Sequence, residues 1–257
     1  MKNPLGIIAS FLSVAVLSVG LMAQPAGAAR YDSAIQQKVT QELQDKKEFR
    51  GVQSSVEDGI VTLSGTVDLY QQKLDAAKKV RKTKDVQGVR NLIEVAGPSI
   101  ADQQLEQKLA DKLYYERVGY YDNAFNYFTL TVKDGVVTVG GETYNDVGRD
   151  TALGEIQRTP GVKDVVNHIK VSPTSLFDDE LRVRAAQAIY RDSALGKYAI
   201  DPARPIRIIV HNGNISLYGT VDSAMDKQIA GMRVSSVPGA FSVKNNLVIE
   251  GQSNTGM

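Results

Sequence analysis

The chain contains no cysteine and no tryptophan, and only two of its 257 residues are histidines. The absence of cysteine excludes disulfide bonds, thiolate metal sites and a lipid-modified N-terminal cysteine, so stability must come from packed cores. The formal net charge is only +1, so no overall field would attract nucleic acid. We therefore expect no nucleic-acid partner, no cofactor and no metal site.

Sequence motifs of common enzymes are absent as well. No G-x-S-x-G, H-E-x-x-H, P-loop or dinucleotide-binding fingerprint occurs. His168 and His211 have no spacing to Asp or Glu that indicates a metal site, so surface or structural roles are expected for both. The chain is expected to be non-enzymatic, although two carboxylates that meet only in the fold would leave no trace in the sequence.

The only long apolar run lies at the N-terminus. Lys2 precedes an uncharged, mostly apolar stretch from Ile7 to Leu21, and Ala26-Gly27-Ala28 has the form of a cleavage site. These features are typical of a secretory signal peptide, and the run is short for a membrane span, which needs about 20 residues. We expect residues 1–29 to be a signal peptide cleaved after Ala28 or Ala29, and the mature protein to be periplasmic. An uncleaved N-terminal anchor is the alternative.

Three segments of the chain repeat one pattern. Each begins with Asp-Gly or Asn-Gly, and the leading glycines are 76 and then 78 residues apart: Gly59, Gly135 and Gly213. A second glycine follows six residues later in every copy: Gly65, Gly141 and Gly219. An asparagine follows 26 residues after that: Asn91, Asn167 and Asn245. Spacings that recur in this way indicate three tandem copies of one module.

The pattern also predicts the elements of each copy. The turn dipeptides lie between alternating apolar residues, which predicts a β-hairpin with positive φ at both turn positions. The second glycine indicates a bulge or a close backbone approach, expected to be by a helix. We expect structural rather than phosphate-binding roles for all six glycines. Apolar residues at four-residue intervals predict one helix before the hairpin and one after it, and Asp68 and Asp222 are expected to cap two of the latter.

A closing strand completes an α-β-β-α-β order in each copy. We expect copies at residues 30–96, 99–172 and 175–250, followed by a tail at 251–257.

Three parts of this pattern resemble a known family. They are the hairpin Asp58–Gly65, the helix after it, and the start of the closing strand, Gly161–Asn167. In these parts the repeat resembles the BON domain, named for bacterial osmotically induced periplasmic and nodulation proteins. Copy three departs from the pattern, since Asn212 replaces the acidic turn residue and Ala240 follows Gly239.

The resemblance implies an α+β fold in which each three-stranded sheet packs on two helices, and an envelope location. It also implies binding to phospholipid or membrane surfaces, in support of envelope integrity or osmotic-stress tolerance. A protein- or peptidoglycan-binding envelope scaffold is the alternative, and the sequence leaves the oligomeric state open.

Copies two and three carry 6 and 8 more residues than copy one between the first helix and the hairpin. In copy two this insertion is aromatic, and tyrosine is favoured at boundaries between water and apolar matter. These residues either contact lipid or a partner, or fill the core beneath a lengthened loop: Tyr114, Tyr115, Tyr120, Tyr121, Phe125 and Tyr127. Phe128, which follows them, is expected in the core.

The second helix of copy one is rich in cations, and a basic helix can lie against anionic lipid. The candidate contact residues are Lys73, Lys78, Lys79, Arg81 and Lys82. A solvated helix face, offset by acidic neighbours, is the alternative.

Overall fold

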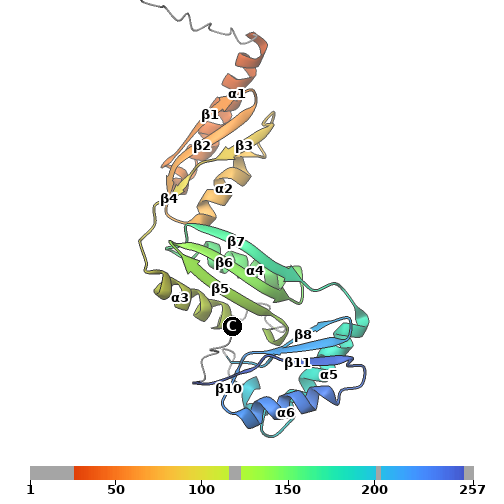
Figure 1. The fold of residues 1–257 in the computed structure, drawn as a ribbon. Helices are drawn as coiled ribbons and strands as arrows, with labels where there is room; N and C mark the ends of the chain where they lie inside the picture. The colour runs from red at the N-terminus through yellow and green to blue at the C-terminus, as the bar shows by residue number, and fades with distance from the viewer. Residues whose placement is uncertain (1–25, 116–122, 201–203, 252–257) are drawn as a thin grey trace, which may run out of the picture.

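The computed structural model describes residues 26–115, 123–200 and 204–251. Within these ranges the chain forms three similar modules that follow one another along the molecule (Figure 1). In each module a β-hairpin and a closing strand form one sheet with the second hairpin strand in the middle. The predicted α+β fold with three copies is confirmed. Most of the expected signal peptide and of the C-terminal tail lies outside the described residues.

The first module contains α1 to β4. Ile35 and Val39 of α1 and Ala76 and Val80 of α2 are buried with Leu63 of β2, so both helices pack on one face of the sheet. The expected cleavage point lies inside α1. The elements are α1 (Ala26–Gln44), the short 3-10 helix η1 (Lys47–Phe49), β1 (Val52–Glu57), β2 (Ile60–Val67), α2 (Tyr70–Val80), β3 (Gly88–Asn91) and β4 (Glu94–Val95).

The second module contains α3 to β7. Its core joins Leu105 and Leu109 of α3 to Val139 of β6 and Ile156 of α4, and it includes Phe128, as expected. The elements are α3 (Asp102–Tyr115), η2 (Asn123–Phe125), β5 (Tyr127–Lys133), β6 (Val136–Thr143), α4 (Asp146–Gln157) and β7 (Asp164–Val171).

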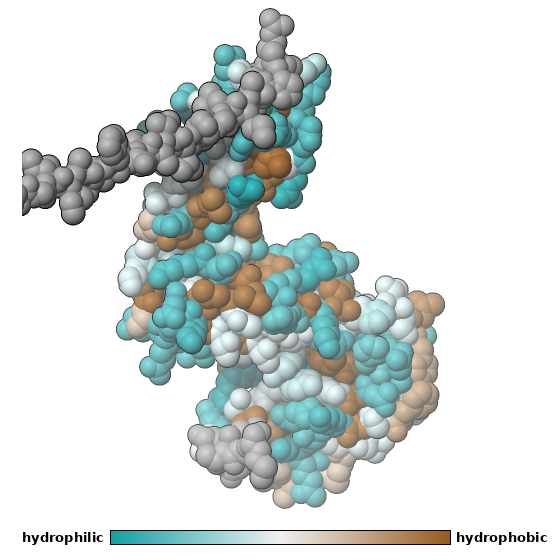
Figure 2. Space-filling model, turned by 45° about the horizontal axis from the view of Figure 1, so that its top comes forward, coloured by the Kyte–Doolittle hydropathy of each residue, from teal (hydrophilic) through white to brown (hydrophobic). Residues whose placement is uncertain are grey.

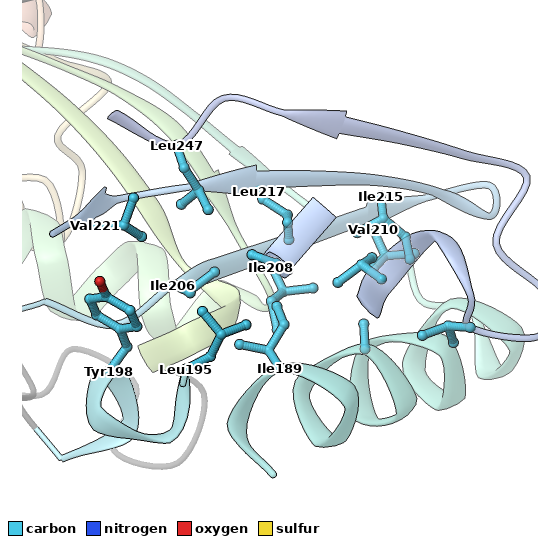
Figure 3. Close-up of a cluster of buried hydrophobic side chains, with 14 of the residues drawn as sticks. Ile189, Leu195, Tyr198, Ile206, Ile208, Val210, Ile215, Leu217, Val221 and Leu247 are labelled. Atoms are coloured by element: carbon cyan, nitrogen blue, oxygen red, sulfur yellow. The ribbon is translucent and has the colours of Figure 1, made fainter. Parts of the chain in front are cut away.

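The third module contains α5 to β12. Figure 3 shows Ile189 of α5 pointing at Ile208 and Leu217 of the sheet, with Leu195 and Tyr198 closing one end of the core. The elements are α5 (Leu176–Tyr190), η3 (Gly196–Ala199), β8 (Arg207–His211), β9 (Asn214–Tyr218), β10 (Thr220–Val221), α6 (Ala224–Ser235), β11 (Ser242–Asn245) and β12 (Val248–Ile249).

The closing strand pairs in parallel with the central strand in the same register in every module. The partners are 28 residues apart: Ile60 and Gly88, Val136 and Asp164, Asn214 and Ser242. In the first and third modules the recurring asparagine then ties this strand to the second helix. Asn91 donates to the Lys73 carbonyl at 2.8 Å, and Asn245 donates to the Lys227 carbonyl at 2.7 Å. The repeated asparagine therefore has a structural explanation in these two modules.

The hairpin turns have the predicted backbone. Asp58 and Gly59 both have positive φ, at 50° and 75°, and the turns of the other two modules match them closely. The second glycine of each copy also has positive φ, but the backbone that approaches it belongs to the first hairpin strand or to the one or two residues before that strand, not to a helix. A Cβ on Gly65 would lie 2.0 Å from the Gly51 carbonyl oxygen, and one on Gly141 would lie 2.0 Å from that of Tyr127. A side chain there would force the hairpin apart.

The expected helix caps are wrong. Helix α2 follows Leu69, and its start is satisfied by Gln72, whose Oε1 accepts the backbone N–H groups of Asp68 and Leu69. Ser223 rather than Asp222 caps α6, through a bond from the Asp226 N–H. Each cap lies one residue or more beyond the expected acid, as is common at helix ends where several polar residues compete.

The first two modules meet through Tyr70, the first residue of α2. Its side chain is 9% exposed and packs with Leu105 and other core residues of the second module. Its hydroxyl bonds to the Asp164 carboxylate at the start of β7, and the Val165 N–H donates to the same carboxylate at 2.8 Å. Burial and these acidic surroundings raise the pKa of Tyr70 to about 12.

Candidate interaction surfaces

Each module has a turn end, formed by the start of its first helix, the hairpin turn and the loop before the closing strand. At this end one aspartate holds the turn. The Asp178 carboxylate accepts the N–H groups of Asn212 and Gly213 at 2.9 and 2.8 Å. The same paired bonds occur at Asp32, with Asp58 and Gly59, and at Asp102, with Asp134 and Gly135. This clamp was not identified from the sequence.

One further position completes the turn end. The residue 28 positions after the turn glycine lies directly over that glycine in each module, because the strand register is the same. It is Gln87 in the first module, Lys163 in the second and Phe241 in the third. The three turn ends therefore share a backbone design but present different side chains.

The turn ends of the first two modules are hollowed. The first holds a cavity of about 600 Å³ that is bordered by Tyr31, Asp32, Asp58 and Asp85. The second holds a cavity of about 260 Å³ between Ser99, Asp134 and Lys163. Since the aspartates that clamp the turns also line these hollows, their carboxylates are already engaged by backbone N–H groups.

The third turn end is apolar. Leu176 is 82% exposed, Phe177 44% and Phe241 74%. Figure 2 shows polar and apolar colours mixed over the surface, with apolar colours along the right-hand edge, where the third module lies. The sequence reasoning did not single out these residues, because they come from two segments more than sixty residues apart.

The predicted basic residues fall into two groups. Lys78, Arg81 and Lys82 are exposed at the C-terminal end of α2, and Lys79 lies 4.0 Å from Glu42 of α1. A shallow groove of about 500 Å³ runs beside them, lined by Glu42, Asp75, Lys78, Lys79 and Lys82. Lys73 lies apart from this groove, near the first turn of α2.

The predicted aromatic residues that the structure describes lie at the contact with the third module. The Tyr127 ring stacks on Tyr218 with centroids 4.0 Å apart, and Phe125 packs against the third core. Tyr114 lies under the guanidinium of Arg207, 4.9 Å from it. These three side chains thus contact a neighbouring module of the same chain. The Tyr115 side chain and the whole of Tyr120 and Tyr121 lie outside the described residues.

Arg207 is central to this junction. Its side chain is 3% exposed and its Nη1 donates to the Asn126 carbonyl at 2.9 Å. Asn126 is buried too, and its side-chain oxygen accepts the Tyr144 N–H at 2.8 Å. Burial lowers the pKa of Arg207, since an apolar setting disfavours the charged form.

One cluster of titratable groups lies near the end of the third module opposite its turn end. Lys197 Nζ lies 2.7 Å from Asp222 and 2.9 Å from Asp226, and the Tyr198 hydroxyl donates to Asp226 at 2.6 Å. Burial raises the pKa of Asp226, but the bonds from Tyr198 and Lys197 outweigh it, so the pKa is lowered. Each of these charges is paired, which is typical of a structural network.

No catalytic or metal-binding arrangement is found in the part of the chain that the structure describes. No group of three or more His, Asp or Glu side chains there could hold a metal ion. His168 and His211 are both exposed, on β7 and β8. Among the helices of the described ranges, none combines the length and apolarity needed to cross a bilayer.

Comparison with known proteins gives one strong result. The sequence model of the BON domain matches three tandem segments, residues 31–97, 101–173 and 191–251. The third match begins after α5, although α5 packs in the third core as α1 and α3 do in theirs. A curated relative, "Uncharacterized protein in gshII 5'region" from Anaplasma centrale, is 25% identical over 155 residues, which cover 56% of this chain and 97% of the relative.

Solved structures overlap with the chain only loosely. The C-terminal domain of CdsD, a structural protein of the type III secretion system of Chlamydia trachomatis, has a TM-score of 0.25 and 14% identity over 83% of this chain and 96% of that one. The periplasmic domain of the type III secretion inner-membrane protein PrgH from S. typhimurium has a TM-score of 0.19 and 10% identity over 83% of this chain and 100% of that one. At these TM-scores the overlap carries no argument about function.

Proposed function

The chain belongs to the BON domain family, and on this premise we propose that it is a non-enzymatic periplasmic protein that binds phospholipid surfaces and supports the cell envelope. Within the described residues, the features that distinguish the modules from one another lie on their surfaces. The differences between turn ends, and the junction between the second and third modules, fit a binding role in which each module contributes a different surface.

The observation that carries the proposal is the group of cations at the end of α2. Among the described residues, Lys78, Arg81 and Lys82 take part in no ion pair, and all three are exposed. Glu42 and Asp75 line the groove beside them, but neither lies within ion-pair distance of these three cations. Each cation near an anionic bilayer contributes about 1 kcal/mol of attraction, which falls off within a Debye length. Three such charges on one helix end are enough to favour an anionic surface over a neutral one.

Vesicle sedimentation tests this proposal directly. A chain that begins at Ala26 retains every described residue and lacks the expected signal run. We expect it to sediment with vesicles of phosphatidylglycerol and phosphatidylcholine, and much less with phosphatidylcholine alone. Binding should weaken between about 0.1 M and about 1 M salt, as the Debye length falls from about 10 Å to about 3 Å.

Charge-matched variants locate the effect. Lys78→Gln, Arg81→Gln and Lys82→Gln together should reduce binding. Lys108→Gln, Lys133→Gln and Lys170→Gln remove the same charge from exposed positions of the second module and should reduce it less. Capture of an envelope protein or wall fragment without any vesicle binding would reject the proposal in favour of the scaffold alternative.

A further inference from the structure

The turn end of the third module carries a small exposed apolar cluster, formed by side chains from two separate segments. Leu176 and Phe177 lie at the start of α5, and Phe241 lies in the loop before β11. The two phenylalanine rings pack together with centroids 5.9 Å apart and planes 30° apart. Water therefore surrounds a cluster of large apolar groups, which is unfavourable unless the cluster has a partner.

The other two modules show that the fold does not require this cluster. Gln87 and Lys163 take the place of Phe241 over the turn glycine, with the same strand register. The residue before the clamping aspartate is Tyr31 in the first module, Ala101 in the second and Phe177 in the third. The paired rings are thus specific to the third module, and the backbone of the turn end does not require them.

One arginine, Arg184, lies beside the apolar cluster, and two more lie further along a groove that leads away from it. The Arg184 guanidinium and the Phe177 ring both lie against Gly239, each 3.4 Å from where a Cβ on that glycine would be. From there a groove of about 730 Å³ runs between α5 and α6, bordered by Arg184, Arg191 and Arg233. Arg184 is 3.4 Å from Glu180, and Arg233 is 2.7 Å from Asp192. Arg191 is in no ion pair among the described residues.

We infer that the third turn end inserts into an anionic bilayer, with Leu176, Phe177 and Phe241 among the acyl chains and Arg184 at the phosphate level. The inference rests on the proposed function and names the element that carries it. Apolar side chains next to a cation match the acyl-chain and phosphate layers of an anionic membrane surface. A stable protein–protein interface needs about 800 Å² on each partner, far more than a point of three side chains offers, so a bilayer is the better occupant.

The test transplants residues from the other modules of the same chain. Phe177→Ala introduces the residue that the second module has at this position, Ala101. Phe241→Gln introduces the residue that the first module has, Gln87. The same turn backbone forms around both residues in those modules, so the third module should still fold. In the chain that begins at Ala26, the double variant should lose about tenfold or more of its affinity for vesicles of phosphatidylglycerol and phosphatidylcholine. Ile200→Gln with Met225→Gln is the matched control, because those side chains are 82% and 62% exposed at the other end of the module.

A fluorescence measurement then reports insertion itself. The chain has no tryptophan, so Phe241→Trp introduces a single probe at the turn end and Met225→Trp introduces one away from it. With the same vesicles, we expect a blue shift and quenching by brominated acyl chains only for Phe241→Trp. If the chain sediments with vesicles while the double variant binds unchanged and the probe at 241 stays unshifted, the inference is overturned and the proposed function stands. If the unaltered chain does not bind at all, both are overturned.

Discussion

One carboxylate fixes the hairpin turn of each module. At the third turn the N–H groups of Asn212 and Gly213 point the same way, because both residues have positive φ. A turn of this kind leaves two neighbouring donors without strand partners, and the two oxygens of Asp178 satisfy one each. The bonds also anchor the start of α5 to the turn, so the clamp sets the distance between helix and hairpin.

Replacing this carboxylate by an amide should weaken the third module. Asp178→Asn keeps one oxygen but sets an NH₂ group against a backbone donor, in a site where the side chain is 4% exposed. A buried donor left unsatisfied costs about 1–3 kcal/mol, so the free energy of unfolding in urea should fall by that amount. Asp150→Asn removes an exposed ion pair with Arg149 and should change it by less than about 0.5 kcal/mol. Equal effects of the two changes would contradict the role of the clamp.

The turn and the clamp differ in how far the sequence reveals them. Asp-Gly and Asn-Gly predict the turns because the turn needs positive φ at two adjacent residues, and these dipeptides adopt it readily. The clamping aspartates lie 26, 32 and 34 residues before the first turn residue, so their spacing does not repeat. The insertion between helix and hairpin changes the spacing while the contact in space stays the same.

At the scale of elements, the aromatic insertion of the second module forms a junction with the third. Tyr127 of β5 stacks on Tyr218 of β9, while Arg207 of β8 reaches across to the carbonyl of Asn126. The Tyr114 ring lies against that guanidinium, and its bond to the carbonyl needs both modules in place. The two modules are therefore held together by a buried polar contact as well as by stacked rings.

Loss of Arg207 should uncouple these modules. Arg207→Met keeps the length of the side chain but leaves the buried Asn126 carbonyl without this donor, at a cost of about 1–3 kcal/mol. Heat capacity traces should show the transition of the second and third modules broaden or split. Arg149→Met is the control, since Arg149 pairs with the exposed Asp146 and Asp150 and lies away from the junction contacts. A single transition of unchanged width in Arg207→Met would show that the ring contacts hold the junction alone.

The helices and hairpins could be predicted from the sequence, but the elements of other modules that they contact could not. Alternation and four-residue periodicity depend on local geometry, and they placed every helix and hairpin of the repeat. The sequence shows that this insertion is rich in aromatic residues. It does not show whether the rings contact lipid, a partner or the core, because all three kinds of contact favour aromatic residues. Tyr218, which stacks on Tyr127, lies 91 residues further along the chain, and no sequence pattern links the two residues.

At the scale of the whole molecule, the two junctions differ in chemistry. The second junction uses several rings and a buried arginine, whereas the first uses Tyr70, its bond at the start of β7, and the apolar side chains of Leu74 and Val95. The repeat predicted three modules because its spacing is regular, but it could not predict their arrangement. Tyr70 has Asp146 and Ala224 at the equivalent positions of the other modules, so nothing in the repeat marks it as a contact.

This difference predicts that alkaline pH weakens the first junction. The pKa of Tyr70 is raised to about 12, so the folded chain favours its protonated form. Its contribution to stability is complete below about pH 10, the value for an unfolded tyrosine, and is lost as pH rises through about 12. Tyr70→Phe removes both the bond to Asp164 and this titration. The difference in unfolding free energy between the unaltered chain and Tyr70→Phe should be about 1 kcal/mol at pH 8 and shrink toward pH 11.5.

Tyr31→Phe is the control. Its side chain is 67% exposed, so the change should lower the unfolding free energy by almost nothing at pH 8. A difference that stays constant with pH would mean that the Tyr70 hydroxyl titrates alike in the folded and unfolded chain, and that the first junction is held by apolar packing alone.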